Sequence, residues 1–201
     1  MALKIYGVAL SRAYRTLWVA EELGLSYELV ETTFTSGVHT PEYLTINPNG
    51  RIPTIDEDGF ILWESLAINL YLAKKHGTLY PTDLEGEARA WQWSFWGTAE
   101  VERPAITALF NRVVLPEDKR DPLAAEAAQK ALTAPLKVLD GVVGPKRYLL
   151  GDQFTVADLN VAAILRNAHH ARIDFTPFPN ARTWLRTCHD RPAAQKARQR
   201  E

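Results

Sequence analysis

The stretch NPNGRIPTIDEDGFILWESLAI (residues 47–68) predicts two strands followed by a helix. PTID and FILW have the composition of short strands, and the DG pair between them is a strong signal for a tight antiparallel hairpin. A proline leads into the first of these strands, where its missing N–H matters least. The helix is expected over residues 64–76 and is closed by Gly77, while polar Glu64 and Ser65 open it.

The residues before this stretch alternate between strand and helix patterns. LKIYG (residues 3–7) is expected to form a strand, residues 12–23 carry apolar side chains at helical spacing, and SYELVE (residues 26–31) alternates again. PEYLTI (residues 41–46) predicts one or two helical turns. The order β-α-β-α-β-β-α makes the first two strands parallel and the last two antiparallel. A four-stranded mixed sheet with helices on both faces is the simplest closure.

The second half of the chain is expected to be helical. Strand signals disappear after TLYPTDLEG (residues 78–86). We therefore place an α/β domain over residues 1–79, a linker over 80–86 and an all-helical domain over 87–201. A long helix in that domain is expected to bend near Pro104, because the proline ring removes a backbone hydrogen bond.

FTVADLNVAAILRNA (residues 154–168) is the clearest local signal in this half. Thr155 can cap a helix, and Asp158, three residues on, reaches back to the cap nitrogen. The following apolar residues recur at i, i+3, i+4 and i+7, which predicts a buried stripe. We interpret this segment as a folding signal rather than as a site of chemistry.

The bulk composition indicates a globular protein without a strongly charged target. The chain has 201 residues, of which 46% are hydrophobic and 23% charged, and its net charge is −1. No general attraction to nucleic acid or to an anionic membrane is therefore expected. No apolar run approaches the ~20 residues that a membrane helix needs, and the first residues lack the pattern of a signal peptide. With Cys188 as its single cysteine the chain forms no internal disulfide, and we expect it to be cytoplasmic.

Neither a metal motif nor a nucleotide motif is present in the sequence. None of the five histidines pairs with another at the HxxxH spacing. The patterns GxGxxG, GK[ST] and GxSxG are also missing. We expect no metal.

Polar residues at the ends of elements in the first domain are the candidates for chemistry. Ser11 lies between the first strand and the first helix, where a hydroxyl can cap the helix or face an anion attracted by the helix N–H groups. If the Ile52–Pro53 bond is cis, the Ile52 N–H and C=O offer an edge to an extended peptide. At Glu64 and Ser65, free helix N–H groups and a hydroxyl suit a carboxylate, and the Glu64 carboxylate suits an ammonium. On residue chemistry alone, a capping role is favoured over a catalytic one for Ser11, and over ligand binding for the Glu64–Ser65 pair.

In this order, these residues resemble the glutathione transferase superfamily, and in particular its serine-type bacterial members. The motifs that carry the resemblance are LKIYG…LS…R, NPNGRIPTID, DGFILWESLAINLYLA and LLGDQFTVADLNVAA, which together span nearly the whole chain. The resemblance implies a thioredoxin-like N-terminal domain, an all-helical C-terminal domain, glutathione as co-substrate and a homodimer.

The resemblance also implies roles for single positions. Ser11 falls where the hydroxyl donates to the glutathione sulfur, and Ile52, before Pro53, falls where backbone groups pair with the cysteinyl unit. Glu64 and Ser65 fall where the γ-glutamyl ammonium and carboxylate are held.

Other positions leave alternatives open. His39 and Arg51 replace the Gln or Lys that members often carry near the glycyl carboxylate, and either can hold it. Tyr6 and Tyr14 are alternative donors to the sulfur.

The second-substrate pocket is implied to involve the long helix that follows the linker. There Trp93 and Trp96 share a face with Glu100 and Arg103. We predict Trp96 and Arg103 as pocket residues, although this face can equally form a domain or dimer interface.

The function implied is transfer of glutathione to a small electrophilic, mostly apolar acceptor. Two alternatives remain. One is a glutathione-dependent peroxidase or dehalogenase, which uses the same thiolate. The other is a non-catalytic glutathione carrier or interaction module.

Overall fold

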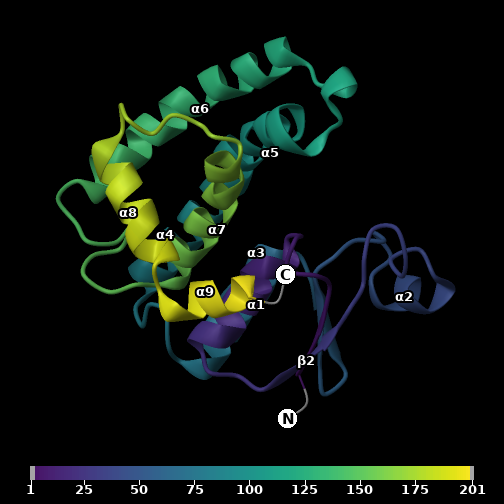
Figure 1. Cartoon of the computed structure of the whole chain (residues 1–201). Helices are drawn as coiled ribbons and strands as arrows, with labels where there is room; N and C mark the ends of the chain where they lie inside the picture. Colours follow the sequence, from purple (N-terminus) through teal and green to yellow (C-terminus); the bar gives the residue numbers. More distant parts are fainter. Residues whose placement is uncertain (1–2, 200–201) are drawn as a thin grey trace. The chain divides into compact units, whose positions relative to one another are not determined.

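The computed structural model describes residues 3–199 and divides the chain into two compact units (Figure 1). The first unit contains the described residues up to Tyr80 together with those from Asp190 onward, and the second extends from Pro81 to His189. This division differs from the expected one, because the last segment belongs to the first unit rather than to the helical domain. Helix α4 (Leu84–Trp96) also begins inside the expected linker. The outer limits predicted for the domains, residues 1 and 201, lie outside the described residues.

The first unit is built on a four-stranded mixed sheet with the strand order β2-β1-β3-β4. Its strands are β1 (Leu3–Tyr6), β2 (Tyr27–Val30), β3 (Thr54–Glu57) and β4 (Phe60–Trp63). β1 pairs parallel with β2 and antiparallel with β3, and β3 forms the antiparallel hairpin with β4. The predicted element order and the predicted strand directions are confirmed.

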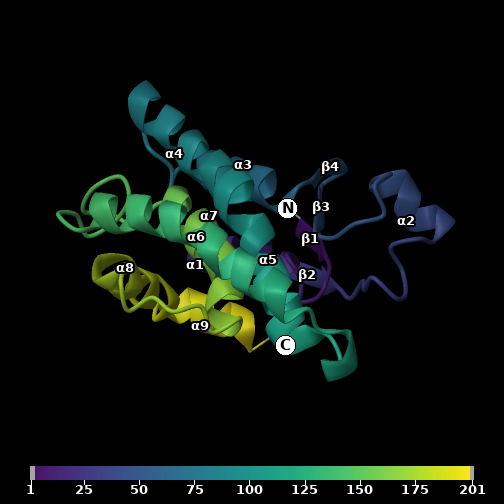
Figure 2. The ribbon, with the colours of Figure 1, turned by 90° about the horizontal axis from the view of Figure 1, so that it is seen from above.

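Helices cover both faces of this sheet (Figure 2). α1 (Ala13–Glu22) and α3 (Ser65–His76) pack on one face, and the short α2 (Pro41–Ile46) lies on the other. The side chains of Ile5, Leu17, Trp18, Ile55 and Ile68 are fully buried and belong to the core of this unit. The expected thioredoxin-like domain is confirmed.

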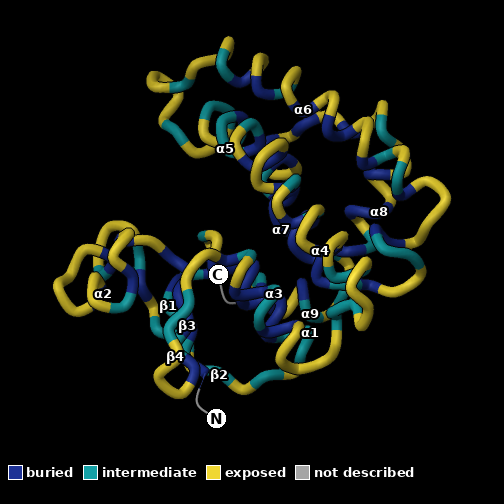
Figure 3. Tube along the Cα trace, turned by 180° about the vertical axis from the view of Figure 1, so that it is seen from behind, coloured by how far each residue is buried: buried dark blue, intermediate teal, exposed yellow. Residues whose placement is uncertain are grey.

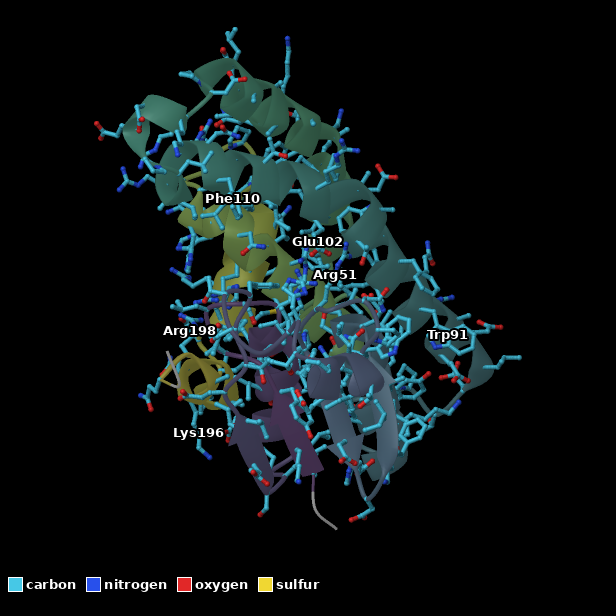
Figure 4. The ribbon with its side chains drawn as sticks, turned by 90° about the vertical axis from the view of Figure 1, so that its right-hand side faces the viewer. Arg51, Trp91, Glu102, Phe110, Lys196 and Arg198 are labelled. Carbon is cyan, nitrogen blue, oxygen red and sulfur yellow. The ribbon has the colours of Figure 1, made fainter. Side chains whose placement is uncertain are left out.

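The last helix, α9 (Pro192–Arg198), packs against α1 (Figure 1). Arg191, just before α9, donates two hydrogen bonds to the Glu22 carboxylate, at 2.6 and 2.7 Å. Lys196 extends from α9 (Figure 4), and its Nζ lies 2.6 Å from a carboxylate oxygen of Glu21. These two ion pairs connect the end of α1 to α9 and to the residue just before it.

The second unit is all-helical in the described residues, apart from loops and an isolated bridge at Tyr148 and Gly151. Besides α4 it contains α5 (Arg103–Leu109), α6 (Pro122–Val143), α7 (Val156–His170), α8 (Pro179–His189), the π-helical η1 (Gly97–Glu102) and η2 (Phe110–Val114), and the 3-10 turn η3 (Glu117–Lys119). Near Pro104, where a bend was expected, the structure has the wider π-helical turn of η1 immediately before α5.

α7 is buried along most of its length (Figure 3). The capping box predicted for its start is present. Asp158 accepts from the Thr155 N–H at 3.0 Å, and it accepts further hydrogen bonds from the Leu149 N–H and the Trp184 indole. No helix in residues 3–199 is both long enough and apolar enough to cross a membrane.

Candidate functional site

Ser11 lies in the turn between β1 and α1, two residues before α1 begins. Its hydroxyl donates to the Val8 carbonyl at 2.7 Å and accepts from the backbone N–H of Ala13 at 3.0 Å. The Val8 carbonyl also accepts the Ser11 N–H at 3.0 Å. In this structure the Ser11 hydroxyl therefore supports the first turn of α1, and its proton is used inside the turn.

The two tyrosines considered as alternative donors both have structural contacts. Tyr6 packs edge-on against Tyr43, with ring centroids 5.9 Å apart. Tyr14 is buried within α1, and its hydroxyl donates to the Ala194 carbonyl of α9 at 3.4 Å. The Tyr14 hydroxyl is therefore used within the first unit, and which hydroxyl donates to the sulfur stays a prediction.

The Ile52–Pro53 peptide bond is cis, which meets the condition set for a peptide-binding edge. The Ile52 side chain is buried in a cluster with Val38 and Tyr43. The backbone N–H and C=O of Ile52 have no hydrogen-bond partner within the part of the chain that the structure describes. They are the kind of free edge that an extended peptide can pair with.

Two side chains from α2 and its C-terminal end fix the backbone just before this edge. The Tyr43 hydroxyl donates to the Arg51 carbonyl at 2.7 Å and lies 2.9 Å from the Thr54 hydroxyl. The Asn47 amide donates to the same carbonyl at 2.8 Å and to the Thr54 hydroxyl at 3.1 Å. Burial raises the pKa of Tyr43, which keeps its hydroxyl protonated as a donor. Sequence reasoning missed this network, although the NPNG turn placed Asn47 close to it.

Glu64 and Ser65 open α3, but neither acts as a simple cap. Glu64 is the N-cap residue, and its side chain makes no capping hydrogen bond. Its φ of 73° lies in the left-handed region, which costs a non-glycine residue roughly 1–3 kcal/mol. Ser65 is buried, whereas the Glu64 side chain is exposed. The capping interpretation therefore does not account for this pair.

Arg51 follows Gly50 in the chain and His39 lies beside Gly50 in space, and both side chains are exposed. Gly50 has φ 59°, and a Cβ added to it would lie 3.0 Å from His39 Nδ1. The loop that carries His39 therefore folds against the Asn47–Gly50 turn, the arrangement required for His39 to take part in binding there.

The two residues predicted for the second-substrate pocket lie in the second unit. Trp96, half-buried, ends α4 and packs edge-on against Trp93, with ring centroids 5.0 Å apart. Arg103, exposed, begins α5 on the far side of the π-helical η1. Their role as a pocket wall stays a prediction. Residues 3–199 contain no group of three or more His, Cys, Asp or Glu side chains able to hold a metal ion.

Comparisons with known proteins cover almost the whole chain. Residues 1–74 match the family model described as "Glutathione S-transferase, N-terminal domain", and residues 101–192 match "Glutathione S-transferase, C-terminal domain". Glutathione S-transferase GstB of Escherichia coli (strain K12) is 32% identical over 187 residues, which are 90% of either chain. Glutathione S-transferase 3 of Zea mays is 33% identical over 205 residues, covering 96% of this chain and 92% of the relative.

A solved structure is similar over the same length. The theta class glutathione S-transferase from Xanthomonas axonopodis pv. citri, with glutathione bound, superposes with a TM-score of 0.91 at 29% identity. The match covers 97% of this chain and 96% of that one.

Proposed function

Because this chain belongs to the glutathione transferase family, we propose that its first unit binds glutathione and activates the thiol for attack on a small electrophilic, mostly apolar acceptor. The similar Xanthomonas structure contains glutathione, which supports the choice of co-substrate. Ser11 supplies a hydroxyl two residues before α1, where a donor to the sulfur is expected.

Each part of the tripeptide has a counterpart in the first unit. The free backbone groups of Ile52 pair with the cysteinyl unit, as an added strand pairs with a sheet edge. The Glu64 carboxylate binds the γ-glutamyl ammonium, and Ser65 with the first N–H groups of α3 binds the γ-glutamyl carboxylate. His39, which lies beside Gly50, or Arg51, the next residue in the chain, binds the glycyl carboxylate.

The hydrogen bonds of Ser11 carry this proposal. When glutathione binds, the hydroxyl turns from the Val8 carbonyl to the sulfur. That carbonyl keeps the Ser11 N–H as its donor at 3.0 Å, so the turn is not left with an unpaired carbonyl. The Ala13 N–H still donates to the Ser11 oxygen, which makes its O–H a better donor.

The expected effect on the thiol is large enough to matter near neutral pH. A free thiol has a pKa of about 8.5, so only a few per cent of it is thiolate at neutral pH. A hydrogen bond to a charged group contributes about 1.5–3 kcal/mol, which lowers a pKa by about one to two units. The N-terminus of α1 adds roughly 0.3–1 kcal/mol. Thiolate then becomes the main species.

Ser11→Ala tests the role of this hydroxyl. We expect conjugation of an aryl halide to fall about tenfold or more, because the lost bond acts on the thiolate. Affinity for glutathione should change less than about threefold, since Ser11 is one contact among many. Ser26→Ala, which removes an exposed serine hydroxyl after α1, is the matched control. Full activity in Ser11→Ala would assign thiol activation to another group.

One alternative has an observation in its favour. The Ser11 proton is used within its own turn, as it would be in a glutathione carrier that never activates the thiol. An aryl-halide assay beside a hydroperoxide assay separates the possibilities. Turnover of the hydroperoxide alone indicates a peroxidase. No activity in either assay, with glutathione binding retained, indicates a carrier.

We also propose that the chain forms a homodimer. β4 is an edge strand, and its side chains Phe60 and Trp63 are 48% and 38% exposed. α4 likewise exposes Trp91 and Phe95. Exposed aromatic side chains of this kind favour association. Light scattering on Phe60→Glu beside the unmodified chain tests this, and an unmodified chain that is monomeric contradicts it.

A further inference from the structure

Arg15 is a buried arginine in the first turn of α1. It is 3% exposed, and its Nη1 lies 3.3 Å from the hydroxyl oxygen of Ser65, which is 4% exposed at the start of α3. A buried guanidinium is costly unless its donors are used, and one of these donors is directed at Ser65. Sequence reasoning gave Arg15 no role, because a single arginine on a helix has no distinctive signature.

The direction of this hydrogen bond determines where the Ser65 proton can go. Arginine donates only, so the Ser65 oxygen is the acceptor. Among the described residues the Ser65 hydroxyl has no other partner, and its own proton has no acceptor. Ser65 thus differs from Ser11, whose proton is already donated to the Val8 carbonyl.

We propose that Arg15 is a positioning residue for glutathione: it holds the Ser65 oxygen so that the hydroxyl proton points at the γ-glutamyl carboxylate. This inference rests on the proposed function. The positive guanidinium polarises the hydroxyl and makes it a stronger donor. With the N–H groups at the start of α3, the site becomes selective for an anion.

A purely structural role predicts something different. If Arg15 only ties α1 to α3, its loss weakens every ligand of the first unit through altered packing. If Arg15 acts through Ser65, its loss weakens only ligands that carry the γ-glutamyl carboxylate. A probe that lacks this one group separates the two roles.

The experiment is a calorimetric titration of four folded proteins with two probes. The proteins are the unmodified chain, Arg15→Gln, Ser65→Ala and the double variant. The probes are glutathione and γ-aminobutyryl-cysteinyl-glycine, which replaces the γ-glutamyl α-carboxylate by hydrogen. Arg186→Gln, which removes an exposed guanidinium on α8, is the matched charge control.

We expect Arg15→Gln to weaken glutathione binding about tenfold, the loss of one charge-assisted hydrogen bond. Binding of the carboxylate-free probe should change less than about twofold. In the Ser65→Ala background the Arg15→Gln substitution should weaken glutathione binding little further, because the Ser65 hydroxyl on which Arg15 acts is already absent. Arg15→Lys keeps the charge and should recover part of the affinity. In steady state, KM for glutathione should rise while kcat at saturating glutathione is kept.

Equal weakening of both probes, or additive effects of the two substitutions, would overturn the positioning role. If Arg15 variants do not fold, NMR of the guanidinium in the unmodified protein replaces them. Its resonance should shift with glutathione but not with the carboxylate-free probe, and equal shifts contradict the proposal. An unmodified chain that does not bind glutathione refutes the proposed function instead.

Discussion

At the scale of single residues, Glu64 is held in a conformation that suits glycine better. Its φ is 73°, and its side chain makes no capping bond that would repay the strain. Strain of this kind is found where a side chain must be presented in one direction. In the proposed site that direction is toward the ligand ammonium.

Glu64→Gly should therefore separate stability from binding. We expect the free energy of unfolding to rise by about 1 kcal/mol as the strain is released. Glutathione affinity should fall about tenfold with the loss of a charged partner. Urea denaturation and calorimetry measure the two effects. Arg172→Gly, at an exposed residue with φ 55° in the second unit, should gain stability without losing affinity. A less stable Glu64→Gly protein, or one with unchanged affinity, contradicts this account.

The sequence predicts which elements carry some of the candidate residues, but it does not predict which residues lie next to them in space. The start of α3 at Glu64 and Ser65 follows from local signals within a few residues, whereas the sequence shows only the position of Pro53 and not the cis form of its peptide bond. The contact between Arg15 and Ser65 joins positions fifty residues apart. Helical periodicity places Arg15 in a helix, but it does not say which helix lies opposite.

At the scale of elements, a polar cluster ties α3 to the sheet. Glu57 on β3 is buried; it accepts from the Tyr71 hydroxyl at 2.7 Å and lies 2.7 Å from Lys75 Nζ. The hydrogen bond to Glu57 raises the pKa of Lys75 above its ordinary value of 10.5. Burial, and next the hydrogen bond to Glu57, raises the pKa of Tyr71 above 10.0.

This cluster predicts a loss of stability in alkali. Folding favours the charged Lys75 and the neutral Tyr71, so both contributions are complete below their ordinary pKa values. They are lost as pH rises through the higher folded values. The stability difference between the unmodified chain and Lys75→Met should therefore shrink above pH 10.5. Denaturant unfolding at a series of pH values measures it, and a constant or growing difference would be the contrary result.

At the scale of the whole molecule, the end of the chain stabilises its beginning. Glu22 is 7% exposed in its side chain, and Arg191 binds it with two short hydrogen bonds. The Lys196 side chain, which pairs with Glu21, is 63% exposed. Both carboxylates are buried, and the Glu21 side chain is only 5% exposed. The two pairs differ in their cations. Losing Arg191 removes two short hydrogen bonds from Glu22. Lys196 lies mostly in water, and its loss leaves Glu21 the hydrogen bond from the Tyr27 hydroxyl.

Arg191→Gln should therefore lower the free energy of unfolding by about 2 kcal/mol, with the partial exposure of Arg191 taken into account. Lys196→Gln, the matched control, should cost less than about 1 kcal/mol. Denaturant unfolding compares them directly. Equal effects would show that α9 does not clamp α1 through Glu22.

The element order of the first unit could be predicted because each element has its own local pattern. The return of α9 to α1 could not, since Glu22 and Arg191 are 169 positions apart. The sequence from Asp190 onward predicts a helix, but only the packing of that helix decides which unit it joins. The π-helical η1 before Pro104 has no local signature either.

The central claim is that Ser11 makes the sulfur of bound glutathione more acidic. Ultraviolet titration of the glutathione complex follows the mercaptide band directly, in the unmodified chain and in Ser11→Ala. We predict a midpoint about one to two pH units below the free thiol value of about 8.5 in the unmodified chain, returning toward that value in Ser11→Ala. A band that rises only at or above the free-thiol value in the unmodified complex, or at the same pH in both proteins, contradicts the claim.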